Sequence, residues 1–114
     1  MRWTRGLGVG ACLLVLAAPA QAGLIFGTIR WQDQSTTTAG LPIQVQCADP
    51  NQHYDGTVQE RGDYRIYVTE LGNCQFKVTV GNQRAAAEVG SYEDEVRYDF
   101  LLVRTADGVQ LVRQ

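Results

Sequence analysis

The chain has 114 residues, with ten Lys and Arg against twelve Asp and Glu, one His and three Cys. Hydrophobic residues make up 45% and charged residues 19%, which is the composition of an ordinary globular protein with room for one domain. This balance excludes a collagen, a coiled coil and a fully disordered chain, and the near-neutral charge gives no indication of nucleic-acid binding.

The start of the chain is typical of an export signal. Two arginines within the first five residues precede an apolar stretch over residues 7–18, and Ala20-Gln21-Ala22 supplies the small residues that signal peptidase accepts. We therefore expect a signal peptide over residues 1–22 and a single domain over residues 23–114. The protein is then exported, to the periplasm or to the extracellular medium.

Two other readings of this segment are disfavoured. The apolar run is about 12 residues, whereas a membrane anchor needs about 20. Lipidation at Cys12 is disfavoured because the most apolar residues follow this cysteine, whereas a lipobox cysteine closes the apolar region. No later segment is long and apolar enough to span a membrane, so we expect no transmembrane segment in the exported chain.

Beyond the signal, two cysteines remain, Cys47 and Cys74. An even count in an exported chain predicts a disulfide, and closing this loop stabilises a domain by about 3 kcal/mol. A metal site needs more ligands, and His53 is the one histidine. A catalytic pair of Cys and His53 is an alternative, but a lone histidine in a polar loop is more often a surface residue.

From residue 24 onward, segments rich in β-formers alternate with turn signals, and a polar loop covers residues 33–40. The six residues at 84–89 are too few for a stable helix between glycines, so we assign them to a strand. Turn signals are Asp49-Pro50-Asn51, Asp55-Gly56, Arg61-Gly62-Asp63, Gly81-Asn82, Gly90-Ser91 and Asp107-Gly108. Strands are predicted over residues 24–31, 43–47, 57–59, 64–68, 74–80, 84–89, 95–104 and 109–112.

Seven or eight strands at this spacing predict an all-β protein, a sandwich or a small barrel. Within the strands, alternation places Ile43, Val45 and Cys47 on one face, and Cys74 and Phe76 likewise share a face. Both cysteines are therefore expected to point toward the core.

Four motifs in a fixed order resemble the carboxypeptidase regulatory-like family, whose domains are similar to transthyretin in fold. The resemblance covers residues 24–103 and implies a single antiparallel β-sandwich, immunoglobulin-like or transthyretin-like, of about seven strands. Cys74 departs from the family pattern, which often has an aromatic residue there. The motifs are Gly27-x-Ile29, Gly40-Leu41-Pro42-Ile43-x-Val45, Gly62-Asp63-Tyr64-x-Ile66 and Leu71-Gly72-Asn73-Cys74-x-Phe76-x-Val78.

Catalytic signatures are missing from the sequence. A transthyretin-like hydroxyisourate hydrolase is implied by resemblance to carry several histidines, an arginine and a C-terminal Tyr-Arg-Gly-Ser motif, whereas this chain has one His and ends in Val112-Arg113-Gln114. The chain also lacks a phosphate loop, a His-Glu-x-x-His motif and a Gly-x-Ser-x-Gly elbow. We therefore predict that the protein is not an enzyme and has no catalytic, metal or cofactor-binding residues. A small hydrolase that uses His53 is a remote alternative.

Domains of the resembled family occur as accessory modules in many exported proteins. We therefore predict a non-catalytic module that mediates protein–protein interaction in the cell envelope, with a partner that the sequence does not name. The alternative is a carbohydrate-binding module, in which flat rings stack on sugar faces. Candidate ligand-facing aromatics are Trp31, Tyr54, Tyr67 and Tyr92. Glu93-Asp94-Glu95 is either a weak calcium site or a solvated junction between a loop and a strand.

Overall fold

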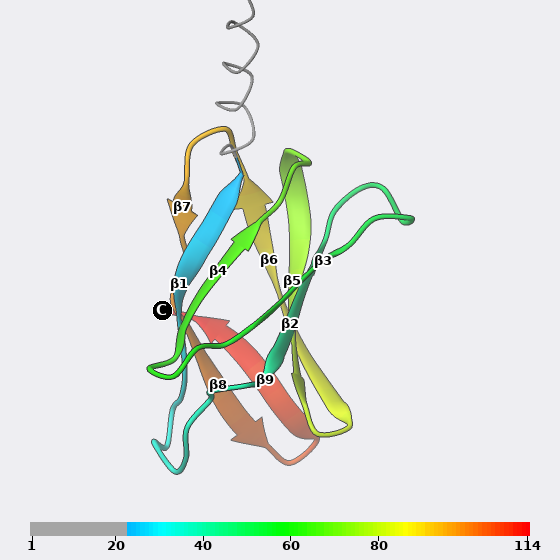
Figure 1. The fold of residues 1–114 in the computed structure, drawn as a ribbon. Coiled ribbons are helices and arrows are strands. Elements are labelled where there is room, and N and C mark those ends of the chain that lie inside the picture. The colour runs from blue at the N-terminus through cyan, green and yellow to red at the C-terminus, as the bar shows by residue number, and fades with distance from the viewer. Residues whose placement is uncertain (1–22) are drawn as a thin grey trace, which may run out of the picture.

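A computed structural model describes residues 23–114 and shows an all-β protein (Figure 1). The predicted signal peptide and Cys12 lie outside the described residues. Within residues 23–114 there is no helix, and therefore none long enough to cross a membrane. The strands are β1 (Leu24–Trp31), β2 (Pro42–Gln46), β3 (Tyr54–Thr57), β4 (Asp63–Tyr67), β5 (Gly72–Val80), β6 (Gln83–Ser91), β7 (Val96–Arg97), β8 (Phe100–Thr105) and β9 (Gly108–Arg113).

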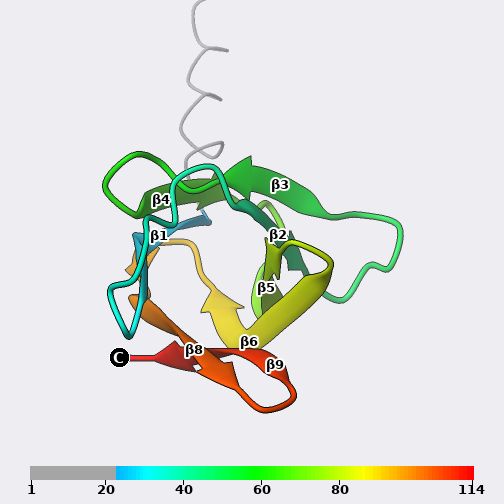
Figure 2. The same cartoon turned by 90° about the horizontal axis from the view of Figure 1, so that it is seen from below.

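The strands form two sheets that pack face to face. One sheet has the order β4-β1-β8-β9, with β7 also paired to β1, and the other has the order β3-β2-β5-β6. All pairs are antiparallel except those of β1 with β7 and β8, which are parallel. At the corners β3 lies against β4 and β6 against β9, so the strands surround a common interior (Figure 2). The predicted β-sandwich is confirmed, with nine strands rather than about seven.

Three local predictions were wrong. The expected strand over residues 57–59 lies earlier, at β3 (Tyr54–Thr57), so Asp55-Gly56 is inside a strand and not a turn. Gly90-Ser91 does not break its strand, because β6 pairs with β5 as far as Ser91. The expected long strand over residues 95–104 is divided into β7 and β8.

The division between β7 and β8 lets two short strands share one side of β1. Ile25 and Phe26 pair with β7, and the residues from Ile29 to Trp31 pair with β8. Between these pairings, the Tyr98 amide donates to the Phe26 carbonyl (2.8 Å). Gly27 lets the Tyr98 carbonyl approach closely, because a Cβ at this position would overlap that oxygen.

Asp99 fills the remaining gap in this ladder. Its Oδ1 accepts the Thr28 amide (2.9 Å) and the Thr28 hydroxyl (3.1 Å), and its Oδ2 accepts Arg97 Nε (3.0 Å). Partial burial alone would raise the pKa of Asp99, but the hydrogen bonds from Arg97 and Thr28 outweigh this effect and lower it. The carboxylate thus stands in for a backbone carbonyl at the strand break.

Four aromatic rings join the two sheets in the core. Tyr64 of β4 meets Phe76 of β5 edge to face, with ring centroids 4.9 Å apart, and Phe76 meets Phe100 of β8 at 5.0 Å. The Tyr64 hydroxyl donates to the Tyr98 carbonyl (2.7 Å), and the Gly90 amide of β6 donates to the Tyr98 hydroxyl (2.8 Å). Burial raises the pKa of Tyr64, so this hydroxyl keeps its proton and remains a donor.

Tyr64→Phe is expected to lower the free energy of unfolding by about 1–3 kcal/mol, because it leaves the buried Tyr98 carbonyl without its donor. Urea denaturation measures the change. Tyr67→Phe, on the same strand but 51% exposed, is the matched control and should change stability by less than about 0.5 kcal/mol. Equal losses in the two variants would contradict the prediction.

Asp99→Asn is expected to cost about 1.5 kcal/mol at pH 7, because an amide keeps the shape but loses the charge-assisted hydrogen bonds. The native pKa of Asp99 is lowered, so its contribution is present above the ordinary value of 3.8 and disappears as pH falls through the lower native pKa. Urea denaturation at a series of pH values should therefore show the two proteins converging in acid. Asp107→Asn, in an exposed turn, should show no such convergence.

Candidate functional site

Polar side chains gather on the outer face of the sheet formed by β3, β2, β5 and β6. On β2 the buried Ile43 and Val45 face the core, so Gln44 faces outward. In the register, Gln44 lies opposite Asp55 of β3 on one side and opposite Lys77 of β5 on the other. An acid, an amide and a base therefore form a row across three strands.

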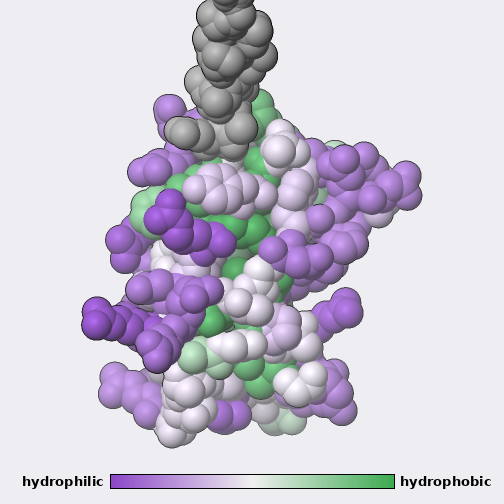
Figure 3. Space-filling view, viewed as in Figure 1, coloured by the Kyte–Doolittle hydropathy of each residue, from purple (hydrophilic) through white to green (hydrophobic). Residues whose placement is uncertain are grey.

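His53 joins this row from the loop between β2 and β3. The loop projects from the sandwich and is covered by hydrophilic residues (Figures 1 and 3). Asp49 shapes it, because its Oδ1 accepts the Asn51 amide (2.9 Å). His53 and Asp55 are two residues apart in extended chain, which places their side chains on the same face.

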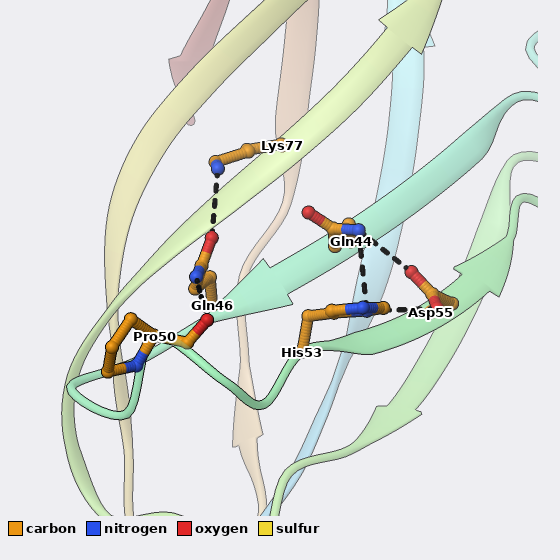
Figure 4. A network of polar contacts seen from close by, with 6 residues as sticks. All are labelled: Gln44, Gln46, Pro50, His53, Asp55 and Lys77. Atoms are coloured by element: carbon orange, nitrogen blue, oxygen red, sulfur yellow. Dashed lines mark hydrogen bonds and ion pairs between the residues drawn. The ribbon is translucent and has the colours of Figure 1, made fainter.

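The histidine, the aspartate and the glutamine are in direct contact (Figure 4). His53 Nδ1 lies 3.2 Å from Asp55 Oδ2, and Gln44 Nε2 donates to Asp55 Oδ1 (3.1 Å). A hydrogen bond from Nδ1–H to the Asp55 carboxylate corresponds to the tautomer in which Nε2 carries the lone pair, and Gln44 Nε2 also lies 3.5 Å from Nδ1. None of the hydrogen bonds within residues 23–114 uses Nε2, and the side chains of His53 and Asp55 are 53% and 62% exposed.

A second chain of contacts holds the His53 loop against β5. Lys77 Nζ donates to Gln46 Oε1 (3.3 Å), and Gln46 Nε2 donates to the Pro50 carbonyl (3.4 Å) (Figure 4). Next to Gln44 and Asp55 the surface forms a hollow of about 90 Å³, whose charged lining also includes Lys77 and Arg84. The hollow thus places two cations beside Asp55, the partner of His53.

The two cysteines form the predicted disulfide, Cys47–Cys74. It connects the neighbouring strands β2 and β5 at one end of their ladder rather than bridging the two sheets. Cys74 is buried and Cys47 is half-buried, so only Cys74 lies fully in the core.

The four candidate aromatics have different surroundings. Trp31 is 4% exposed, with the Arg104 guanidinium 3.8 Å above its ring. The Tyr54 hydroxyl is engaged by the protein, lying 2.9 Å from Gln52 Oε1 and 3.0 Å from Glu70 Oε2, one of which accepts its proton. Tyr67 and Tyr92 are 51% and 55% exposed. The four rings therefore do not form a single platform.

The Glu93-Asp94-Glu95 segment is exposed, between β6 and β7. Among residues 23–114, no three His, Cys, Asp or Glu side chains are placed so that they could hold a metal ion together.

Gln44, Asp55 and Lys77 were not predicted from the sequence as site residues. Asp55 was assigned to a turn with Gly56, which hid the fact that it shares a strand face with His53. The signal that was present is the alternation of His53-x-Asp55, but it requires knowing that β3 begins at Tyr54. Lys77 requires the register of β2 against β5, which a single sequence does not contain.

Comparisons with known proteins identify the fold. No family model and no curated protein matches the chain. The structure is similar to that of Klebsiella pneumoniae 5-hydroxyisourate hydrolase, with a TM-score of 0.58 and 12% identity, over 81% of this chain and 98% of that chain. This likeness confirms the transthyretin-like fold that the motifs implied.

Two other solved structures are less similar to this chain. An (S)-allantoin synthase matches 90% of this chain and 48% of its own, with 12% identity and a TM-score of 0.47. A 9R-lipoxygenase from Cyanothece PCC8801 matches 73% of this chain and 16% of its own, with 16% identity and a TM-score of 0.43.

The Klebsiella likeness overturns two predictions, the non-catalytic interaction module with its carbohydrate-binding alternative and the statement that the protein is not an enzyme. The first depended on the view that a domain of this fold is an accessory part of other exported proteins, and the second on the absence of known catalytic signatures. The same fold accounts for 98% of the hydrolase chain, so that view fails. At 12% identity the likeness shows the fold alone, and an activity has to be argued from this chain's own residues.

Replacing both Cys47 and Cys74 with alanine is expected to lower the free energy of unfolding by about 3 kcal/mol, because the unfolded chain regains the entropy of a 27-residue loop. Urea denaturation of the oxidised parent and of the variant measures the loss. The parent treated with reductant should behave like the variant. An unchanged midpoint in both would contradict the prediction.

Proposed function

We propose that the protein is a small hydrolase in which His53 is the general base. The observation that carries this proposal is the 3.2 Å contact between His53 Nδ1 and Asp55 Oδ2, which leaves Nε2 available to a water molecule. The transthyretin-like fold supports it, since a protein of this fold is a hydrolase. The disulfide and the predicted signal peptide support an exported location. Membership in the carboxypeptidase regulatory-like family stays a prediction.

In the proposed reaction, His53 Nε2 takes a proton from water while the water oxygen attacks a carbonyl carbon. The bond to the leaving group then breaks, and the proton passes from the imidazolium to that group, which restores the base. Asp55 accepts the Nδ1 hydrogen bond, holds the ring in its orientation and stabilises the transient imidazolium. Gln44 fixes Asp55 by donating to its other oxygen (3.1 Å).

The hollow beside Asp55 favours a substrate that carries a negative charge. Lys77 and Arg84 supply two cations to its lining, against the single carboxylate of Asp55. Lys77 uses one of its three N–H donors on Gln46, so two remain for a substrate. The substrate of the Klebsiella enzyme, 5-hydroxyisourate, is not carried over, because the additional histidines and the C-terminal motif implied for that activity are missing from this chain.

The test compares a neutral ester, 4-nitrophenyl acetate, with an anionic one, 4-nitrophenyl hydrogen succinate, by the release of nitrophenolate. We expect the anionic ester to be hydrolysed with the higher kcat/KM. His53→Ala should lower kcat/KM by about 100-fold or more, which is the usual size of general-base catalysis. Asp55→Asn should lower it about tenfold, and Lys77→Gln should remove most of the preference for the anionic ester.

Asp94→Asn is the matched control, because it removes an exposed carboxylate elsewhere and should leave both rates unchanged. Hydrolysis that survives His53→Ala would sink the proposal, and so would the absence of hydrolysis of either ester by the parent protein.

A further inference from the structure

A second hollow, of about 230 Å³, lies between the loop that connects β1 to β2 and the turn that connects β3 to β4. It shares no lining residue with the hollow beside Asp55. Arg30, Arg61, Thr36 and Thr37 are among the residues that line it. Trp31 lies along one wall.

The walls of this hollow are held in place by buried contacts. The Ile29 amide donates to the Gly62 carbonyl (2.8 Å), and the hydroxyl of Thr38, 3% exposed, donates to the Ile29 carbonyl (2.6 Å). Gly62 has a φ of +87°, and a Cβ there would lie 2.9 Å from the Ile29 carbonyl oxygen. The turn can approach β1 this closely because the residue is glycine, so loop and turn form a preformed recess.

The recess carries unneutralised positive charge. Arg30 Nη2 donates to the Arg61 backbone carbonyl (3.4 Å), which joins the Arg30 side chain to the turn that carries Arg61, and neither arginine belongs to an ion pair within residues 23–114. Glu60 is the acidic residue of the lining. Residues 23–114 hold eight basic and twelve acidic residues, so the recess is cationic on a chain that is acidic overall.

The nearby carboxylate of Asp33 already accepts hydrogen bonds from Ser35 and Arg104. Its Oδ1 accepts the Ser35 amide (2.9 Å), and its Oδ2 accepts Arg104 Nε (3.3 Å). Hydrogen bonds from Ser35, with a smaller contribution from Arg104, lower the pKa of Asp33 and keep it charged and paired. It therefore does not compete for Arg30 and Arg61.

We propose that this recess binds a small oxyanion, a carboxylate or a phosphate group, between Arg30 and Arg61. Guanidinium groups match such anions with paired N–H donors. Thr37 adds a donor, because its oxygen accepts the Ala39 amide (3.0 Å) and its own proton is unused in that contact. The volume suits a molecule smaller than a drug-sized ligand.

Trp31 provides the reporter for a test. The full chain has two tryptophans, so with Trp3→Phe the fluorescence comes from Trp31 alone. This protein is titrated with inorganic phosphate and, separately, with succinate, each against sodium chloride at equal ionic strength. We expect a saturable change with at least one anion and none with chloride, and the tighter of the two identifies the preferred group.

Arg61→Gln and Arg30→Gln should each weaken this binding at least tenfold. Arg65→Gln, an exposed arginine of β4 outside the recess, is the matched control and should bind as the parent does. Amide shifts of Thr36 and Thr37 in ¹H–¹⁵N spectra provide a second readout, and an unchanged melting temperature shows that the variants fold. A response shared equally by Arg61→Gln and the parent, or no saturable response in either readout, would overturn the proposal.

Discussion

Two buried hydrogen bonds, from Tyr64 to Tyr98 and from Gly90 to Tyr98, are the interactions on which the rest of the structure depends. Tyr64 donates to the Tyr98 carbonyl, and the Tyr98 hydroxyl accepts the Gly90 amide, so β4, the β7–β8 connection and β6 are connected through one buried residue. The Tyr64 bond ties β4 to the β7–β8 connection within one sheet, and the Gly90 bond crosses to β6 of the other sheet, where no backbone ladder connects them. Apolar contacts between Tyr64, Phe76 and Phe100 exclude water from them, which strengthens each bond. Both candidate sites are built on the sheets held in this way.

Much of the fold was predictable because its signals are local. Alternation identified the core faces of β2 and β5, and Gly81-Asn82 identified the hairpin between β5 and β6. The break between β7 and β8 was not predictable, because residues 95–104 are uniformly typical of a strand. The break comes from Asp99 reaching Thr28, 71 residues away in the sequence. A contact of that kind leaves no trace in the local pattern.

The candidate sites were less predictable than the fold. His53 was recognised as a remote catalytic candidate, but its partner Asp55 was assigned to a turn, since Asp-Gly is a turn signal in most sequences. Trp31 was expected to face a ligand and instead forms the buried wall of a recess beneath Arg104. Arg30 and Arg61 were not connected at all, because their proximity follows from the approach of Gly62 to Ile29. Both candidate sites depend on the register between strands and on contacts between a loop and a strand, which a single sequence does not specify.

The parallel pairing of β1 with β8 has a consequence for how the chain folds. The first strand, β1, lies between β4 and β8 in its sheet. Ile29 can pair with Phe100 on the β8 side only after Phe100 has been synthesised. Synthesis delivers β1 early and β8 almost last, so the sheet cannot close on a partly made chain. Contacts this distant in sequence slow folding, because the loop between them must first be closed. A chain with this topology completes this sheet only after β8 has been made.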